Sequence, residues 1–454
     1  MTSRHPASST PPTLVCGEAD RMLKTAMSAI ALIATTTFAP SALAQDAEDA
    51  LTVIHAGWLL AVPGEDPLME QSILIRGERV EGIESGYVTP DGATIIDLSD
   101  DYVMPGFIDS HVHLQSELGP GRRFNTFTMS PSDLAFDGAV NAGTTLRAGF
   151  TTVQDVGGSF EASLALRDAI NDGDIPGPRM RIAGSAVTPT GGHADVNGFS
   201  LDVLHTFASE TACNGEAQCR EAVRTLIRGG ADVIKITATG GVLSDTAAGV
   251  EQQFFDDELS AIVEAAHMMG RRVTAHAHGV TGINSFLEAG GDSIEHGTYL
   301  DRESIRLMRR NGAYLVPTVL AGVTVAEMAE TVDFMTDNQR AKSREVGPLM
   351  LEMARRAHEG GVMIAFGTDS GVSRHGVNAR EFELLVEAGL TPMEAIVTAT
   401  INASRHVQMD GDIGTIEAGK LADIIAVDGN PLENISELRD MDFVMKGGEV
   451  YLNP

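Results

Sequence analysis

Short apolar or β-branched runs alternate with helix-like stretches along most of this chain. Eight such runs occur between about residues 103 and 408, with helix-like stretches such as 256–269 and 391–409 between or after them. The runs span residues 103–113, 151–157, 179–187, 232–241, 272–279, 293–299, 314–320 and 363–371. Eight strand-then-helix units over about 300 residues are the number that a closed parallel barrel needs. The sequence therefore predicts an α/β fold, a (β/α)8 TIM-like barrel, with an open doubly wound sheet as the alternative.

Two segments with shorter strand-like runs flank the predicted barrel. The first covers residues 51–101 and the second covers residues 414–454. Each is too short to be stable alone, so we expect the two to meet as one small composite β-sandwich domain built from both chain ends. We predict a dispensable N-terminus with a signal peptide over residues 1–44 and the N-terminal part of the sandwich over residues 45–102. The barrel follows over residues 103–408, and the C-terminal part of the sandwich over residues 409–454.

The N-terminal region is typical of a secretory signal. From Met22 the chain reads Met-Leu-Lys, followed by a mostly apolar stretch over residues 26–38 and by Ala42-Leu43-Ala44 before Gln45. A charged start, a short apolar centre and a small-residue end define such signals. As a membrane anchor the apolar stretch is too short, because about 13 residues of helix rise only about 20 Å. We expect a periplasmic or secreted protein, cleaved near Ala44, with no membrane partner.

The charge balance excludes one class of partner. Acidic residues outnumber Lys plus Arg by 63 to 32, which gives a net charge of −31. Such a chain repels a phosphate backbone, so we expect no nucleic-acid partner. The excess suits a salt-rich exterior, although an ordinary periplasmic enzyme explains it nearly as well. Cys213 and Cys219 are the cysteines that survive cleavage, and they could close one small disulfide loop in an oxidising compartment.

Histidines gather at the ends of the predicted strands. Barrel enzymes carry their reactive groups at the C-terminal ends of strands. A single histidine there is more often a hydrogen-bonding core residue than a metal ligand, but several together favour a metal site. Of the 13 histidines, five end or closely follow strands and two lie in the loops after strands three and eight: His111, His113, His276, His278 and His296, then His193 and His375.

The first strand carries the sharpest motif, His111-Val112-His113. Residues two apart on a strand point to the same side, so both imidazoles can share one cation. The motif follows the string MPGFIDS over residues 104–110, and Asp369 ends strand eight in the string GTDS. Together these features resemble the amidohydrolase superfamily.

Longer strings are similar to one branch of that superfamily, the imidazolonepropionase-like branch that contains Xaa-Pro dipeptidases, and the resemblance spans about residues 51–450. The strings are GFTTVQDVGG at 149–158, GGHAD at 191–195, GGVLS at 240–244, IEHG at 294–297 and GKLAD at 419–423. Some relatives hydrolyse N-acyl amino acids or the mycotoxin ochratoxin A, an amide of phenylalanine. The resemblance implies a metal-dependent hydrolase that cleaves an amide C–N bond of a dipeptide, an N-acyl amino acid or ochratoxin A.

Lys235 ends the apolar stretch inside predicted strand four. A buried ammonium group is costly without a partner, so a buried salt bridge is one interpretation. The other is a neutral amine that adds carbon dioxide to give a carbamate, as the strand-four lysine does in binuclear members of the family. The resemblance then implies two divalent ions, which we expect to be zinc, held by His111, His113, Lys235, His276, His296 and Asp369.

Roles for the remaining site residues follow from the same resemblance. His276 lies 41 residues after Lys235 and 20 before His296, so we favour it as the ligand and expect His278 to support the ligands from behind. Asp369 would accept the proton of the attacking water and return it to the leaving amine. His193 would stabilise the oxyanion or hold a substrate carboxylate, with a loop-fixing hydrogen bond as the alternative. Further carboxylate partners are expected in the loop after strand eight, at Arg374 and His375.

Other functional classes remain in competition with this interpretation. A mononuclear deaminase of a nitrogen heterocycle would keep the paired histidines and Asp369, but it would bind one metal ion and have no use for Lys235. A non-catalytic periplasmic binding protein would lose ligands that this chain keeps. Phosphotriester hydrolysis is a conceivable side activity of the same apparatus. We expect a small-molecule substrate and a homo-oligomer, as in many relatives.

Overall fold

The computed structural model describes residues 50–245 and 249–453 of the chain. The predicted signal peptide at residues 1–44 lies outside this part. Among the described residues, no helix has both the length and the apolar character needed to cross a bilayer.

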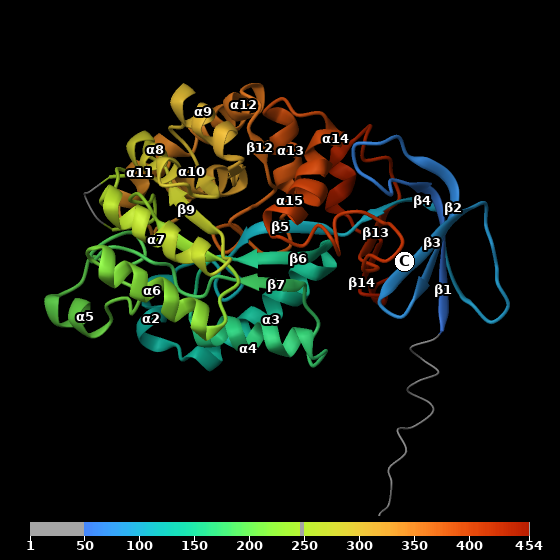
Figure 1. Ribbon diagram of the computed structural model, residues 1–454, viewed down its shortest axis with the longest axis horizontal. Helices are drawn as coiled ribbons and strands as arrows, with labels where there is room; N and C mark the ends of the chain where they lie inside the picture. The colour runs from blue at the N-terminus through green and yellow to red at the C-terminus, as the bar shows by residue number, and fades with distance from the viewer. Residues whose placement is uncertain (1–49, 246–248, 454) are drawn as a thin grey trace, which may run out of the picture. The chain divides into compact units, whose positions relative to one another are not determined.

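Parallel strands alternate with helices through the central part of the chain (Figure 1). Three strands form one parallel sheet in the order β5-β6-β7, and five form a second in the order β12-β11-β10-β9-β8. The bounds are β5 Phe107–Val112, β6 Phe150–Asp155, β7 Arg179–Ile182, β8 Ile234–Thr237, β9 Val273–Ala277, β10 Ser293–His296, β11 Tyr314–Val316 and β12 Met363–Ile364. Most of these strands consist wholly of buried residues, which explains their continuous apolar character in the sequence.

Backbone hydrogen bonds connect the two parallel sheets at both of their ends. Beyond β7, the amide of Val187 donates to the carbonyl of Lys235 at 2.8 Å, and the amide of Thr237 donates back to Val187 at 3.1 Å. Beyond β12, the amide of Asp369 donates to the carbonyl of His111 in β5 at 2.8 Å. The last link brings the residue after the eighth parallel strand beside the first, and therefore places Asp369 next to the His111-Val112-His113 motif.

The helices begin and end where the local sequence provides capping groups. The Ser130 hydroxyl accepts the amide of Asp133 at the start of α3, and Pro131 occupies its first turn. Helix α9 begins at Asp301 in the same manner and ends at Gly312, whose φ is 67°. The helices are α2 Arg122–Thr128, α3 Pro131–Arg147, α4 Phe160–Asn171, α5 Leu201–Thr206, α6 Glu216–Gly229, α7 Asp256–Met268, α8 Val280–Glu288, α9 Arg302–Asn311, α10 Val319–Thr331, α11 Asp337–Val346, α12 Leu349–Glu359, α13 Arg380–Glu387, α14 Pro392–Val397 and α15 Ala403–His406, with a π-helical turn at Thr398–Asn402 and a 3₁₀ turn at Ile435–Arg439.

Strands from both chain ends make one seven-stranded sheet in the order β15-β14-β13-β4-β1-β2-β3. In its centre β13 runs antiparallel to β4, with Ile424 opposite Pro105 and Val427 opposite Tyr102. The two ends thus meet in one sheet, while a two-layered sandwich stays a prediction. The bounds are β1 Leu51–Leu59, β2 Leu68–Arg76, β3 Arg79–Ser85, β4 Thr94–Pro105, β13 Ile424–Val427, β14 Phe443–Lys446 and β15 Glu449–Leu452.

Cys213 and Cys219 form a disulfide with their Cα atoms 5.0 Å apart. Both side chains are fully buried at the start of α6. The bond closes the short loop through Gly215, and the amide of Cys213 donates to the carbonyl of Thr188 at 2.9 Å. The disulfide therefore anchors α6 to the segment after β7.

Candidate metal centre

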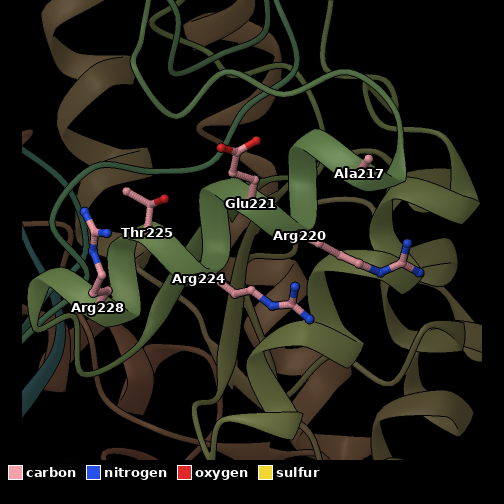
Figure 2. Close-up of a pocket in the computed structure, with 6 residues that line it drawn as sticks. All are labelled: Ala217, Arg220, Glu221, Arg224, Thr225 and Arg228. Atoms are coloured by element: carbon pink, nitrogen blue, oxygen red, sulfur yellow. The ribbon is translucent and has the colours of Figure 1, made fainter.

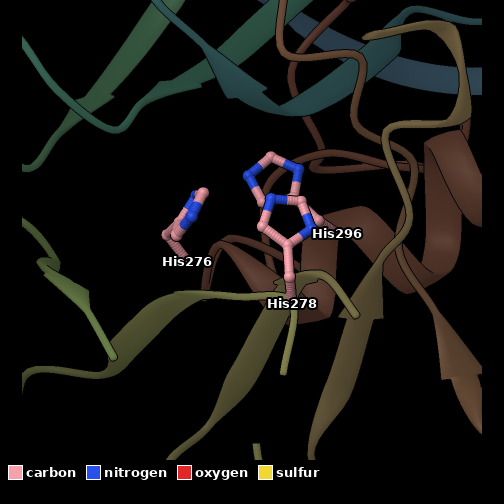
Figure 3. A group of neighbouring side chains, drawn as sticks. All are labelled: His276, His278 and His296. Atoms are coloured by element: carbon pink, nitrogen blue, oxygen red, sulfur yellow. The ribbon is translucent and has the colours of Figure 1, made fainter. Parts of the chain in front are cut away.

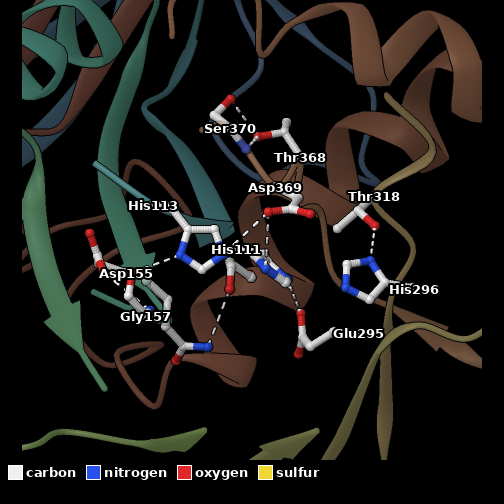
Figure 4. Close-up of polar contacts among 12 residues, drawn as sticks. His111, His113, Asp155, Gly157, Glu295, His296, Thr318, Thr368, Asp369 and Ser370 are labelled. Atoms are coloured by element: carbon white, nitrogen blue, oxygen red, sulfur yellow. Dashed lines mark hydrogen bonds and ion pairs between the residues drawn. The ribbon is translucent and has the colours of Figure 1, made fainter. Parts of the chain in front are cut away.

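Two groups of potential metal ligands lie at the ends of the parallel strands. His111 and His113 in and after β5 approach Asp369, with Nε2 atoms 3.5 and 3.3 Å from its Oδ1 atom (Figure 4). The second group consists of His276 in β9, His278 just after β9, and His296 in β10 (Figure 3). Within each group the ligand atoms lie within 4.8 Å of one another. The structure thus brings together Asp369 and the five histidines predicted at the strand ends.

Lys235 in β8 is buried with 4% of its surface exposed, and its Nζ atom has no hydrogen-bond partner among the described residues. The alternative of a buried salt bridge is therefore not observed there. Its charge acts on His111 of one group and on His276 and His296 of the other. Burial lowers the pKa of Lys235, against the opposing effect of Glu295 and Asp369. The side chain can therefore be held as a neutral amine close to both groups.

Each histidine that offers Nε2 to its group is fixed through its other ring nitrogen. Such contacts set the tautomer and orient the ring toward a metal. The Nδ1 atom of His111 lies 2.6 Å from Glu295 Oε2, and that of His113 lies 2.8 Å from the Gly157 carbonyl oxygen. The Nδ1 atom of His278 lies 2.8 Å from Thr298 Oγ1, and that of His296 lies 2.7 Å from Thr318 Oγ1. Sequence reasoning missed these four partners, because they come from distant segments. Only Glu295, next to His296, could have been noticed, because an acidic residue inside an apolar strand is unusual.

Burial sets the protonation states of the two groups. It lowers the pKa of His111, His276 and His296 well below the usual value, and that of His278 to about 4. Burial alone would raise the pKa of Asp369, but His111, His113 and Lys235 together lower it to about 2. Neutral imidazoles and an ionised carboxylate are the forms that bind divalent cations.

Three residues at the centre have the left-handed backbone conformation that favours glycine. The φ values are 55° for Asp369, 71° for His296 and 49° for Thr318, which holds the His296 ring. Non-glycine residues pay for this conformation, and such residues concentrate at functional sites. Strand β12 ends at Ile364, although the sequence predicts a strand to residue 371, because the amide of Phe366 donates to the carbonyl of Thr398 and not to the neighbouring strand.

The donor set fits divalent metal ions. Asp369 Oδ1 is buried and makes no hydrogen bond of good geometry, although two imidazole nitrogens lie close to it. Lys235 Nζ, beside the same ligand groups, is likewise buried and without a hydrogen-bond partner among the described residues. Unpaired buried polar atoms are costly, and coordination to a metal would remove that cost. The geometry does not separate His276 from His278, because both belong to the second group.

His193 lies against this second group, and its ring stacks on His276 with centroids 4.1 Å apart. Its Nδ1 atom makes a short hydrogen bond with the Ser244 hydroxyl. A Cβ atom at Gly241 would collide with the His193 ring, so only glycine fits there. Lys342 holds the same loop by donating to the carbonyls of Gly241 and Ser244, each at 2.7 Å.

Arg374 and His375 are not brought to the centre. Arg374 is exposed, and His375 is buried with its Nε2 atom 3.0 Å from the carbonyl of Ser116. Neither lines the cavity described below. The lining of the cavity in this loop reaches Val372 and does not include Arg374 or His375, so neither side chain is placed to contact a substrate in that cavity.

A cavity of about 1030 Å³ contains both ligand groups and Lys235. Drug-sized ligands occupy pockets of about 300–1,000 Å³, so the cavity can hold a large substrate. One wall is aromatic: Phe127 contacts Phe199 and Phe207 edge to face, with centroids 4.9 and 4.8 Å apart. A smaller depression of about 450 Å³ lies along α6, lined by Arg220, Arg224 and Arg228 among others (Figure 2). It contains none of the ligand residues, so the chemistry belongs to the large cavity.

Comparisons with known proteins agree with this geometry. An ochratoxinase from Aspergillus niger is 33% identical to the chain over 442 residues, which cover 91% of this chain and 89% of that enzyme. A crystal structure of a Xaa-Pro dipeptidase with bound methionine in the active site is 41% identical, covers 89% of this chain and 100% of its own, and superposes with a TM-score of 0.84. A prolidase complexed with N-methylphosphonate-L-proline is 32% identical, with the same coverages and a TM-score of 0.81.

These structural neighbours imply a TIM-barrel-like α/β fold for the parallel strands, as the sequence predicts. The amidohydrolase family model matches residues 102–451, and divalent metals are general in that family. The chain therefore belongs to the amidohydrolase family, in its prolidase and ochratoxinase branch, and is a hydrolase of amide C–N bonds.

Proposed function

We propose that the protein is a binuclear amidohydrolase that cleaves dipeptides of the Xaa-Pro type or N-acyl amino acids, with ochratoxin A as a candidate substrate. The observation that carries the proposal is the pair of ligand groups, His111–His113–Asp369 and His276–His278–His296, with unpartnered Lys235 acting on both. Nitrogen and oxygen donors of this kind suit zinc, which we propose as the metal. We further propose that the eight parallel strands close into a (β/α)8 barrel.

Lys235 would be carboxylated in the active enzyme. Its neutral amine forms a bond from Nζ to the carbon of carbon dioxide and loses one proton, which leaves a carbamate anion. That anion would offer two oxygen donors to divalent ions held by the two ligand groups. The carboxylation also replaces an unpartnered buried amine by a coordinated anion, and so explains why the Nζ atom has no partner from the described residues.

The protein groups would then divide the remaining work. Two bound divalent ions would acidify the attacking water and polarise the scissile carbonyl. Asp369 accepts the proton of that water and returns it to the leaving amine nitrogen, so that the amide C–N bond breaks and the products are a carboxylic acid and an amine. His193 would donate a hydrogen bond from Nε2 to the carbonyl oxygen as negative charge develops, and its contact with Ser244 and its stacking on His276 support this role.

The cavity supports a substrate with a large apolar group. Its volume of about 1030 Å³ exceeds what a small dipeptide fills. The aromatic wall of Phe127, Phe199 and Phe207 offers ring edges and faces to an aromatic acyl group or side chain. This feature favours N-acyl aromatic amino acids, and hence ochratoxin A, within the proposed class.

We also propose export with cleavage near Ala44. The Cys213–Cys219 disulfide supports this proposal, because structural disulfides persist in oxidising compartments. The N-terminal sequence of the mature protein from a periplasmic extract would test it, and a chain that keeps residues 1–44 would contradict it.

The deciding experiment is a hydrolysis screen with metal-replete mature protein. Xaa-Pro dipeptides, N-acyl aromatic amino acids and ochratoxin A form the test panel, with adenine-like heterocycles as the deamination control. We expect amide hydrolysis together with about two metal ions per chain. One metal ion per chain with release of ammonia from a heterocycle would instead establish the mononuclear deaminase.

A further inference from the structure

Arg122 at the start of α2 lines the large cavity and is partly buried there. Its guanidinium group makes no hydrogen bond and no ion pair with any described residue. Arg123 beside it is fully engaged: it pairs with Asp245 at 3.0 Å, donates to the carbonyl of Gly198 at 3.1 Å and lies over the Phe199 ring. Two neighbouring arginines on one cavity wall thus differ in that only one has an anionic partner.

The lack of a partner matters because of where Arg122 lies. Burial lowers the pKa of Arg122, and the Asp369 carboxylate opposes this effect. The guanidinium group therefore interacts electrostatically with the candidate metal-ligand group across the cavity. An arginine keeps its charge in proteins and carries five N–H donors in a planar fork. Removing such donors from water without an acceptor is costly, and an anionic ligand would recover that cost.

The cavity offers no other cation for this task. Within the described part of the chain, its lining includes three lysine or arginine residues: Arg122, Arg123 and Lys235. Lys235 is committed to the metal centre under the proposed function, and Arg123 is neutralised by Asp245. Arg122 is therefore the lining cation that is left for a substrate anion.

We propose that Arg122 binds the free carboxylate of the leaving amino acid, which makes the enzyme selective for amides with a C-terminal carboxylate. A guanidinium matches a carboxylate with two parallel N–H···O bonds, which fixes orientation as well as affinity. The substrate class would then be N-acyl amino acids and dipeptides with a free C-terminus, not internal peptide bonds or simple amides. The proposal rests on the proposed function and takes the place of the contact first expected at Arg374 and His375.

The test compares two substrates that differ in one group. N-acyl-L-phenylalanine and the N-acyl derivative of 2-phenylethylamine share the scissile amide and the ring, but only the first carries a carboxylate. We expect R122A to lower kcat/KM for the acid by about 10- to 100-fold and to change kcat/KM for the carboxylate-free analogue by less than about 3-fold. R122K should recover part of the loss, because it restores the charge without the planar fork. R123A is the matched control, and its ratio of acid to analogue should stay that of the wild type.

A second readout does not require turnover. Calorimetry with 3-phenylpropanoate and 3-phenylpropanol, neither of which has an amide, measures the carboxylate preference directly in the metal-loaded protein. If the wild type hydrolyses no amide but its preference for 3-phenylpropanoate is lost in R122A, the proposed function fails and the role of Arg122 stands. The role of Arg122 would be overturned if R122A lowered kcat/KM equally for the acid and its carboxylate-free analogue, or lowered affinity equally for 3-phenylpropanoate and 3-phenylpropanol. No loss for either compound of a pair would also overturn it, even if the amidase activity is confirmed.

Discussion

The Nδ1 atom of His111 lies 2.6 Å from Oε2 of Glu295, and both side chains are at most 1% exposed. This contact turns the Nε2 atom of His111 toward Asp369 (Figure 4). The carboxylate also increases the basicity of the ring as a ligand. We expect Glu295→Gln to weaken metal binding by about 10- to 100-fold, measured by competition with a chelator.

A matched control separates metal positioning from general stability. Glu258 is also a buried glutamate, but it caps α7 by accepting the amide of Phe255 at 2.9 Å, and it accepts the amide of Gly215, which precedes α6, at 2.5 Å. We expect Glu258→Gln to lower the free energy of unfolding and to leave chelator competition unchanged. Equal effects of both variants on metal binding would remove Glu295 from the positioning of His111.

Lys235→Ala should abolish hydrolysis and reduce the metal content below two ions per chain, because the variant cannot form the carbamate. Elemental analysis of the dialysed protein gives the metal content. Carbon-13 NMR after exposure to labelled bicarbonate should show a carbamate carbon in the wild type, and that signal should be absent from the variant. Unchanged turnover in Lys235→Ala would refute the bridging role.

Asp369→Asn should lower kcat by about 10²- to 10⁴-fold with a much smaller loss of stability. Asparagine tolerates the φ of 55° at this position, so the backbone can be kept while the proton acceptor is removed. Steady-state kinetics and thermal unfolding of the same preparation compare the two effects. Kinetics like those of the wild type would exclude Asp369 from the proton transfer.

His406 predicts an acid-sensitive fold. Burial lowers its pKa to about 4, and its Nε2 atom contacts the Ser293 hydroxyl at 3.1 Å. In the unfolded chain histidine titrates near pH 6.5, so below that pH the unfolded state binds a proton that the folded state does not bind. Stability therefore falls as the pH drops from about 6.5 to about 4, by about 3 kcal/mol from this residue. We expect denaturant titrations of His406→Gln to show a weaker pH dependence over that range, and an identical dependence would contradict the assignment.

The clustering of the candidate ligand residues was predictable because strand geometry acts locally. A period of two places His111 and His113 on one side of β5, whatever the rest of the chain does. An ammonium group in an apolar strand marks Lys235 for the same local reason. Thr318 and Glu295 were not predictable as ring partners, because their contacts with His296 and His111 depend on how separate strands pack.

The loops limited what the sequence could show about substrate contacts. Position after strand eight made Arg374 a reasonable carboxylate partner, but its side chain is exposed and does not line the cavity. Arg122 and Arg123 are adjacent in the sequence and equally basic there. Only the packed structure shows that Asp245, 122 positions after Arg123, neutralises Arg123, whereas Arg122 has no such partner among the residues that the structure describes.

The central pairing of β4 with β13 also has a consequence for synthesis of the chain. Strand β4 is complete by residue 105, but its neighbour begins only at Ile424, so one of its hydrogen-bonding edges stays open while more than 300 residues emerge. Open edges recruit strands from other chains. A ribosome that stalls or terminates between Asp369 and Ile424 should therefore release an aggregation-prone fragment, even though every residue of the candidate metal centre would already be present.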